Sequence, residues 1–136
     1  MAKYIGLMSG TSMDGVDAVL CDISDNAFGH QCQTLAAYSL SYPDELLSAL
    51  NALCTEGNNE LNTLAVADRL VAEVFADAVH ALLAQENLSA SDITAIGSHG
   101  QTIRHHPDCN VLSLSFSKDN LRAFTCQIGD ANTLAV

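Results

Sequence analysis

The sequence is 136 residues long, 49% of them hydrophobic, with a formal net charge of -11 from sixteen acidic and five basic residues. This length and composition predict one folded globular domain and exclude a disordered chain. The negative charge repels phosphate backbones and anionic lipids, so it argues against nucleic-acid binding and membrane attachment. No run approaches about 18 apolar residues and no basic leader precedes an apolar segment, so we expect a cytoplasmic protein.

The cysteines, at positions 21, 32, 54, 109 and 126, are odd in number and form no CxxC pair. This spacing fits neither a disulfide framework nor a zinc ribbon. We expect reduced thiols, with Cys21, Cys54 and Cys126 buried as small apolar side chains.

His105, His106 and Cys109 have metal-like spacing, but they lack a fourth ligand and Pro107 interrupts them. A tetrahedral site needs four ligands, or three and an open position. We therefore expect no metal site made of protein side chains here.

Two strand-like runs, Lys3 to Met8 and Val16 to Ile23, flank a tip rich in glycine, hydroxyl and carboxylate groups. Apolar residues occupy both faces of the second run, which predicts a strand covered on both sides. A turn over residues 25–29 then leads to a third antiparallel strand over residues 31–42. We predict that three meandering strands open the domain.

The tip between the first two strands has the chemistry of a polyphosphate site. Glycines at 10 and 15 permit positive φ and close approach of a ligand to the main chain. Backbone amides in a tight turn form a concave donor site, and hydroxyls add uncharged donors. The alternative is a hairpin that binds nothing, because Asp-Gly tips are common. The candidate phosphate-binding residues are Gly10, Thr11, Ser12, Met13, Asp14, Gly15, Val16 and Asp17.

Two helices follow the third strand. Pro43 favours the first turn of a helix that runs to about Cys54, and apolar residues at helical spacing predict a second over residues 61–85. A short buried strand over residues 93–97 then adds in parallel to the sheet, because a helix crosses over before it. This order predicts an α/β fold that begins like ribonuclease H, with a mixed sheet and flanking helices. Residues 111–117 and 121–128 predict a later β-hairpin.

Three blocks resemble, in order, the anhydro-N-acetylmuramic acid kinase family. They read YIGLMSGTSMDGVDAVL over residues 4–20, AIGSHGQTIRHHP over 95–107 and QIGDANTLA over 127–135. The resemblance implies a lobe of the actin, hexokinase and sugar-kinase superfamily, with ATP and Mg²⁺ as cofactors. It also implies an enzyme that hydrolytically opens 1,6-anhydro-N-acetylmuramic acid and phosphorylates O6, a step in murein recycling.

In this family the substrate carries a lactyl carboxylate and an N-acetyl group. Gln101 and Thr102 offer neutral donors and acceptors for such a sugar, and the Arg104 fork matches a carboxylate. We expect these residues beyond the end of a strand, where open α/β sheets bind ligands. Arg104 is alternatively a surface ion-pair partner, and His99 either polarises a sugar hydroxyl or bonds the backbone. Asp130 is a helix N-cap, a cleft carboxylate, or both.

Members of the resembled family are longer and have two lobes. Residues 1–136 are thus expected to be an incomplete N-terminal lobe without its second lobe, and the catalytic aspartate is expected beyond Val136. We expect the chain alone to be inactive. Apolar surface exposed by truncation predicts self-association, with a homodimer as the simplest form. A non-catalytic nucleotide-binding or scaffold lobe of the same fold is the alternative function.

One position departs from the wider superfamily. Many relatives place a Mg²⁺-linked aspartate near the end of the first strand, and here Met8 stands in its place. A thioether is a poor ligand for Mg²⁺. Asp14 and Asp17 are the alternatives for the metal, although Asp17 could equally be a paired structural acid.

Overall fold

The computed structural model describes residues 2–107 and 123–136. Its strands are β1 (Ala2–Ser9), β2 (Gly15–Asn26), β3 (Gly29–Ser41), β4 (Ile93–His106) and β5 (Phe124–Ile128). Its helices are α1 (Asp44–Leu53), α2 (Glu60–Gln85), the 3₁₀ turn η1 (Ala90–Asp92) and α3 (Ala131–Ala135). The predicted strand over residues 111–117 lies outside the described residues.

The described strands form one mixed sheet in the order β3-β2-β1-β4-β5. β1 pairs in parallel with β4, whereas the other neighbouring pairs are antiparallel. The parallel pair forms because α1 and α2 carry the chain from β3, at one edge of the sheet, back to the far side of β1. The predicted meander and the parallel addition are therefore confirmed.

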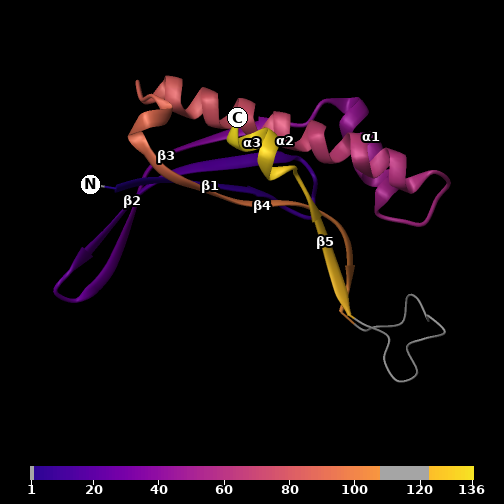
Figure 1. Ribbon diagram of the computed structural model, residues 1–136, viewed down its shortest axis with the longest axis horizontal. Helices are drawn as coiled ribbons and strands as arrows, with labels where there is room; N and C mark the ends of the chain where they lie inside the picture. The colour runs from indigo at the N-terminus through magenta and orange to yellow at the C-terminus, as the bar shows by residue number, and fades with distance from the viewer. Residues whose placement is uncertain (1, 108–122) are drawn as a thin grey trace.

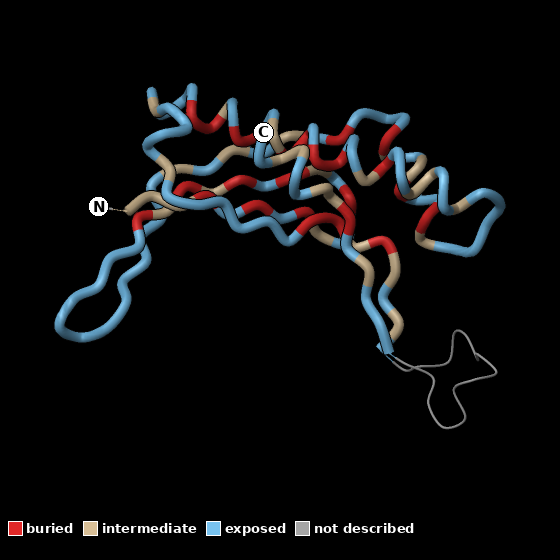
Figure 2. Tube along the Cα trace, in the orientation of Figure 1, coloured by how far each residue is buried: buried red, intermediate tan, exposed pale blue. Residues whose placement is uncertain are grey.

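The described helices lie on one face of the sheet (Figure 1). The long α2 presents Val71, Phe75 and Leu82 to the core, at the three- and four-residue spacing that its sequence predicts. From the sheet, Ile5 and Leu20 are also fully buried. Complete burial of one such side chain contributes about 1.5–3 kcal/mol. Figure 2 shows this buried layer between α2 and the central strands.

Residues 2–107 and 123–136 leave the opposite face of β2 uncovered, which corrects the prediction of a strand buried on both sides. Among the described residues no helix lies over this face (Figure 1). Ile23 on β2 is 38% exposed and Met8 on β1 is 53% exposed, while Val16 and Leu20 on the helical side are buried. The apolar residues on both faces of β2 thus have a partner layer on one side of the described fold.

β4 extends to His106, so the expectation that residues 98–106 lie beyond a short strand is wrong. β1 supports the first half of β4 and β5 supports the second half, which allows polar residues to remain in the ladder. A bulge interrupts the β1 pairing, since Leu7 faces Ser98 while Ser9 faces Gln101. Gly100 absorbs the extra residue at φ +76°, and a Cβ there would lie 2.5 Å from the carbonyl oxygen of Ile128.

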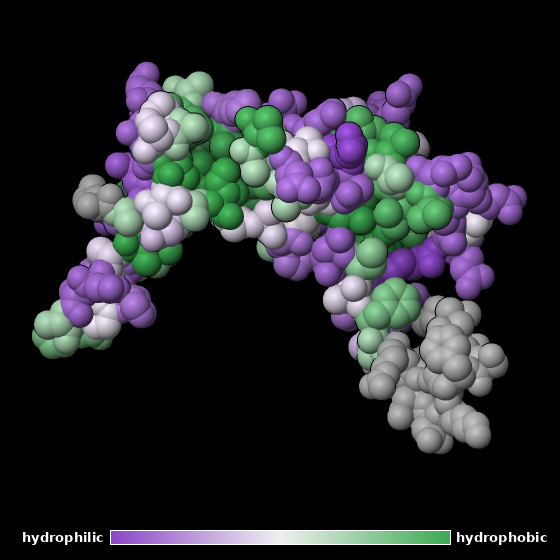
Figure 3. Space-filling model, viewed as in Figure 1, coloured by the Kyte–Doolittle hydropathy of each residue, from purple (hydrophilic) through white to green (hydrophobic). Residues whose placement is uncertain are grey.

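Apolar surface also remains on the helical side of β4. Ile96 pairs with the buried Ile5, yet Ile96 is 38% exposed because α2 leaves this part of β4 uncovered. Figure 3 shows hydrophobic residues at the surface where the helical layer meets the sheet. None of the described helices has the length and hydropathy needed to cross a membrane.

The cysteines of the described ranges are free thiols, as predicted. Their burial differs from the prediction, because Cys21, Cys54 and Cys126 are only half-buried. Cys21 lies on the face of β2 that the described helices leave uncovered. Cys54 and Cys126 pack against the edge of the core, so all three thiols are partly exposed.

Candidate functional site

The β1–β2 hairpin closes through a five-residue loop, residues 10–14. The amide of Met13 donates to the carbonyl of Gly10 at 3.1 Å, which forms the turn. Met13, not Gly10, has the left-handed backbone, with φ 54°, so the predicted use of positive φ at Gly10 is wrong. The buried Met13 side chain joins the core and fixes the tip despite this strained conformation.

The two glycines of the tip have different roles. A Cβ on Gly10 would meet its nearest neighbour, Ser12 Oγ, at 3.9 Å, so the space beside Gly10 is open. A Cβ on Gly15 would lie 2.1 Å from the carbonyl oxygen of Leu40 on β3. Gly10 thus leaves room for a ligand, whereas Gly15 is required by the close approach of two strands.

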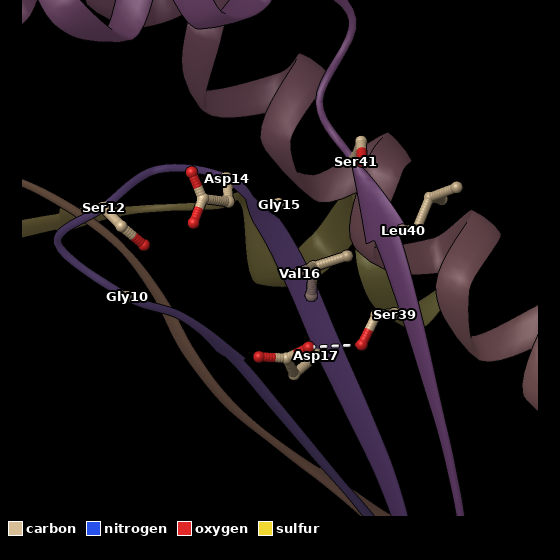
Figure 4. A pocket seen from close by; sticks show the side chains of 9 residues that line it. All are labelled: Gly10, Ser12, Asp14, Gly15, Val16, Asp17, Ser39, Leu40 and Ser41. Atoms are coloured by element: carbon tan, nitrogen blue, oxygen red, sulfur yellow. Dashed lines mark hydrogen bonds between the residues drawn. The ribbon is translucent and has the colours of Figure 1, made fainter.

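A cavity of about 300 Å³ opens beside this hairpin (Figure 4). This volume is at the lower end for ligand pockets. Asp17 brings a carboxylate from the start of β2, and the loop brings the Asp14 carboxylate and the Ser12 hydroxyl. Of the predicted residues, Thr11 and Met13 do not line the cavity. The lining consists of Gly10, Ser12, Asp14, Gly15, Val16, Asp17, Ser39, Leu40 and Ser41.

The three lining residues from β3 were missed by the sequence analysis. Ser39 is the cross-strand partner of Asp17, and its hydroxyl donates to Asp17 Oδ1 at 2.5 Å (Figure 4). Asp17 is also paired with Met8 on β1. Paired residues point to the same face of a sheet, so the Asp17 carboxylate emerges directly beside Met8. No local motif marks Ser39, because its place in the site depends on strand register.

Gln101 lies under the hairpin and not in the open, which corrects the expectation that it faces a cleft. Its side chain is 0% exposed. The amide nitrogen donates to the carbonyls of Gly10 and Thr102 at 3.2 and 3.1 Å. The amide oxygen accepts from the hydroxyls of Ser9 and Tyr42 at 2.5 and 3.2 Å. Gln101 therefore connects β4 directly to the predicted phosphate loop.

Arg104 is an ion-pair partner in this structure, which was the alternative to its predicted role in binding a carboxylate. Nε donates to the carbonyl of Leu53 at 2.9 Å and Nη2 donates to the carbonyl of Thr55 at 2.7 Å, at the end of α1. Nη2 also forms an ion pair with Glu60 at the start of α2. The guanidinium is thus held by two helix termini, and a substrate carboxylate would have to replace Glu60.

His99 and Thr102 lie along β4. His99 is exposed, and Nδ1 lies 3.3 Å from the carbonyl oxygen of Gly100. The half-buried Thr102 accepts a hydrogen bond from Gln127 Nε2 at 3.0 Å through its hydroxyl. Both therefore keep polar atoms near the surface, on a strand that contacts the hairpin through Gln101.

Asp130 is the N-cap of α3, as one of its two predicted roles requires. Its carboxylate accepts from the amide and the hydroxyl of Thr133 at 3.1 and 2.6 Å. These bonds hold the pKa of Asp130 below its ordinary value, because they favour the ionised form. Asp130 is half-exposed, so one face of the carboxylate remains accessible.

Asp68 on α2 has a role that the sequence did not indicate. Oδ1 of its carboxylate accepts from the amide of Gly129 at 2.7 Å. The Asp68 carbonyl accepts from the amide of Asp130 at 3.1 Å. Asp68 thus fixes the loop between β5 and α3, across a separation of 61 residues that no local pattern reveals.

The mixed sheet, its helical layer and the hairpin cavity define an α/β domain. The family model described as "Anhydro-N-acetylmuramic acid kinase" matches residues 2–136. The chain belongs to this family.

Curated relatives agree with the family match. The anhydro-N-acetylmuramic acid kinase of Shewanella sp. (strain ANA-3) is 50% identical over 134 residues, which cover 98% of this chain and 32% of the relative. The relative from Shewanella oneidensis (strain MR-1) is 48% identical with the same coverage. The chain thus spans about a third of the length of these proteins. A cryo-EM structure of CasPhi-2 (Cas12j) bound to crRNA aligns at a TM-score of 0.25 and 19% identity, over 68% of this chain and 16% of that one, and carries no argument about fold.

Proposed function

We propose that this chain is the N-terminal part of an ATP-dependent sugar kinase of the cytoplasm. Its substrate is 1,6-anhydro-N-acetylmuramic acid, which it opens hydrolytically and phosphorylates on O6 to give N-acetylmuramic acid 6-phosphate. The main support for this proposal is the cavity beside the β1–β2 hairpin, because six of its nine lining residues belong to the first block of the family resemblance. The domain is then the ribonuclease H-like lobe of a sugar kinase.

The cavity fits a Mg²⁺–phosphate complex better than a bare phosphate. None of its nine lining residues is basic, and two are carboxylates, which repel an uncompensated phosphate. Carboxylate and hydroxyl oxygens are ligands that Mg²⁺ accepts. Asp17 and Asp14 would hold the ion, and Asp17 is placed beside Met8, where many superfamily relatives carry an aspartate. Bound Mg²⁺ would supply the charge neutralisation that phosphoryl transfer requires.

The nucleotide phosphates would rest on the open side of Gly10. No Cβ occupies that space, and Ser12 offers a hydroxyl at its edge. A hydrogen bond to a charged group contributes about 1.5–3 kcal/mol, so each lost donor weakens nucleotide binding roughly ten- to a hundredfold. Gly10 to Asp17 thus form the proposed ATP site, with Met13 acting as its anchor in the core.

The sugar would bind along β4 and the loop after β5. His99, Thr102 and Asp130 keep exposed or half-exposed polar groups suited to sugar hydroxyls and the N-acetyl group. Arg104 would release Glu60 and bind the lactyl carboxylate in its place. Gln101 would not contact the sugar, because its amide is buried. The catalytic base is assigned to none of the described residues.

The product tests this reaction most specifically. The 1,6-anhydro bond joins C1 to O6; if O6 receives the phosphoryl group, the oxygen of water must bond to C1. We therefore expect one ¹⁸O atom in the sugar phosphate when the complete gene product that carries this sequence is assayed in H₂¹⁸O with Mg·ATP. Mass spectrometry locates the label. A phosphorylated sugar that retains its anhydro bond and contains no ¹⁸O would contradict the hydrolytic step.

A further inference from the structure

Gln101 is the most completely buried polar side chain near the proposed ATP site. It is 0% exposed, and four hydrogen bonds satisfy its amide. The orientation of the amide is fixed by its partners, because two backbone carbonyls surround the nitrogen and two hydroxyls surround the oxygen. Rotation by half a turn would place the amide oxygen against both carbonyls. Such a buried group is stable only when every partner is present.

One end of the phosphate loop bonds this amide, and the other end lies across Ser9 from it. Gly10, the first residue of the loop, bonds Gln101 through its carbonyl. Gly15, the first residue after the loop, is reached through Ser9, whose hydroxyl lies 2.6 Å from the Gly15 carbonyl and 2.5 Å from Gln101 Oε1. A hydroxyl has one proton, so Ser9 donates to one of these two oxygens at a time.

A third strand completes the network. Tyr42, just after β3, donates its hydroxyl to Gln101 Oε1 at 3.2 Å. A tyrosine hydroxyl is protonated at neutral pH, and burial raises the pKa of Tyr42 further. The ends of β1 and β3 and the middle of β4 therefore converge on one side chain beneath the loop.

We propose that Gln101 is a positioning residue for the nucleotide phosphates. It acts through the Gly10 carbonyl and the Ser9 hydroxyl, which fix the loop that presents the donors, and it does not itself contact ATP or the sugar. The inference rests on the proposed kinase function and assigns Gln101 a role toward the nucleotide instead of the sugar.

The test is Gln101→Glu in the complete gene product that carries this sequence. The substitution keeps the shape of the side chain but replaces the two N–H donors with an acceptor facing two carbonyls. We expect KM for Mg·ATP and Kd for Mg·ADP, measured by calorimetry, to rise about ten- to a hundredfold. We expect KM for the sugar to change less than threefold. Leu82→Ala is the control, because it creates a cavity in the core beside α2. It should lower the thermal midpoint of unfolding without changing KM for Mg·ATP or Kd for Mg·ADP.

Ser9→Ala is the second variant and tests the network from the hairpin side, should Gln101→Glu not fold. It removes one hydroxyl and should give a smaller, nucleotide-specific loss. Equal increases in both KM values, or a larger increase for the sugar, would overturn the inference. If the unaltered protein binds no Mg·ADP and shows no turnover, the proposed function fails. If it binds and both variants bind equally well, only the positioning role fails.

Discussion

At the residue scale, Asp17 is the side chain on which the proposed metal role depends. It lines the cavity, accepts from Ser39 and lies opposite Met8. Asp17→Asn removes the charge and keeps the shape, so we expect turnover to fall about ten- to a hundredfold and to require more Mg²⁺. ADP release measured over a series of Mg²⁺ concentrations checks this.

Asp25→Asn is the matched control, because Asp25 lies near the distant end of β2 and outside the cavity. It should leave the Mg²⁺ dependence unchanged. An unaltered Mg²⁺ dependence in the Asp17 variant would show that Asp17 is a structural acid paired with Ser39.

Arg104 is the residue for which substrate binding and structure compete most directly. Its guanidinium now bonds the end of α1 and Glu60. If it also receives the lactyl carboxylate, Arg104→Ala should raise KM for the sugar at least tenfold and leave KM for Mg·ATP nearly unchanged. Glu60→Gln frees the guanidinium, so it should not raise KM for the sugar. Parallel increases in both KM values for Arg104→Ala would identify a purely structural arginine.

At the element scale, the β1–β2 hairpin combines a residue needed for packing with one needed for space. Gly15→Ala would force a Cβ against the Leu40 carbonyl, so β2 and β3 must separate. Overpacking of this kind costs about 1–3 kcal/mol of folding free energy. Gly10→Ala meets only Ser12 Oγ and should fold normally, yet it should weaken nucleotide binding by filling the phosphate space.

Chemical denaturation and Mg·ADP calorimetry distinguish the two glycines. The prediction is a stability loss for Gly15→Ala and an affinity loss without a stability loss for Gly10→Ala. Gly6→Ala is the control for both, because a Cβ there meets no atom within 4 Å. Unchanged affinity of the Gly10 variant for Mg·ADP would show that the phosphates do not bind on this side of the loop.

The sequence was sufficient for elements whose apolar spacing is regular. The stripe of α2 and the alternation around β1 and β2 predicted those elements within a few residues. The sequence did not predict the full length of β4, because the polar run from Ser98 onward resembles a loop. That run stays extended since β1 and β5 supply the pairing, and the bulge at Gly100 accommodates the mismatch.

For the site, the sequence identified the hairpin but not its supports. The glycine, hydroxyl and carboxylate groups of residues 10–17 are adjacent in the chain, so their chemistry is visible locally. Ser39 and Asp68 act through partners 22 and 61 residues away. Gln101 looks like a solvent-facing donor in the sequence and is buried only because three strands converge on it. Such placements follow from register and packing, which one sequence does not encode locally.

At the scale of the whole molecule, the uncovered sheet face predicts self-association of the 136-residue chain. Met8 and Ile23 lie on that face and are 53% and 38% exposed. The net charge of -11 opposes association, so added salt should promote it by screening. We expect light scattering to report a dimer or larger species at high salt.

Substitutions locate the surface responsible. Ile23→Ser should shift the scattering mass toward the monomer. Leu61→Ser, on an exposed position of α2, is the control and should not. A monomer at every salt concentration would contradict the prediction, and an equal effect of both substitutions would exclude the sheet face as the contact.

The role proposed for this chain is to contribute the ATP site of a kinase acting on anhydro-N-acetylmuramic acid. The most direct measurement is coupled ADP release with that sugar and Mg·ATP, run in parallel on the 136-residue chain and on the complete gene product that carries it, with the Shewanella sp. (strain ANA-3) relative as positive control. We predict sugar-dependent ADP release by the complete product and none by the 136-residue chain. No release by either, while the relative is active, would contradict the kinase function and favour a non-catalytic nucleotide-binding lobe.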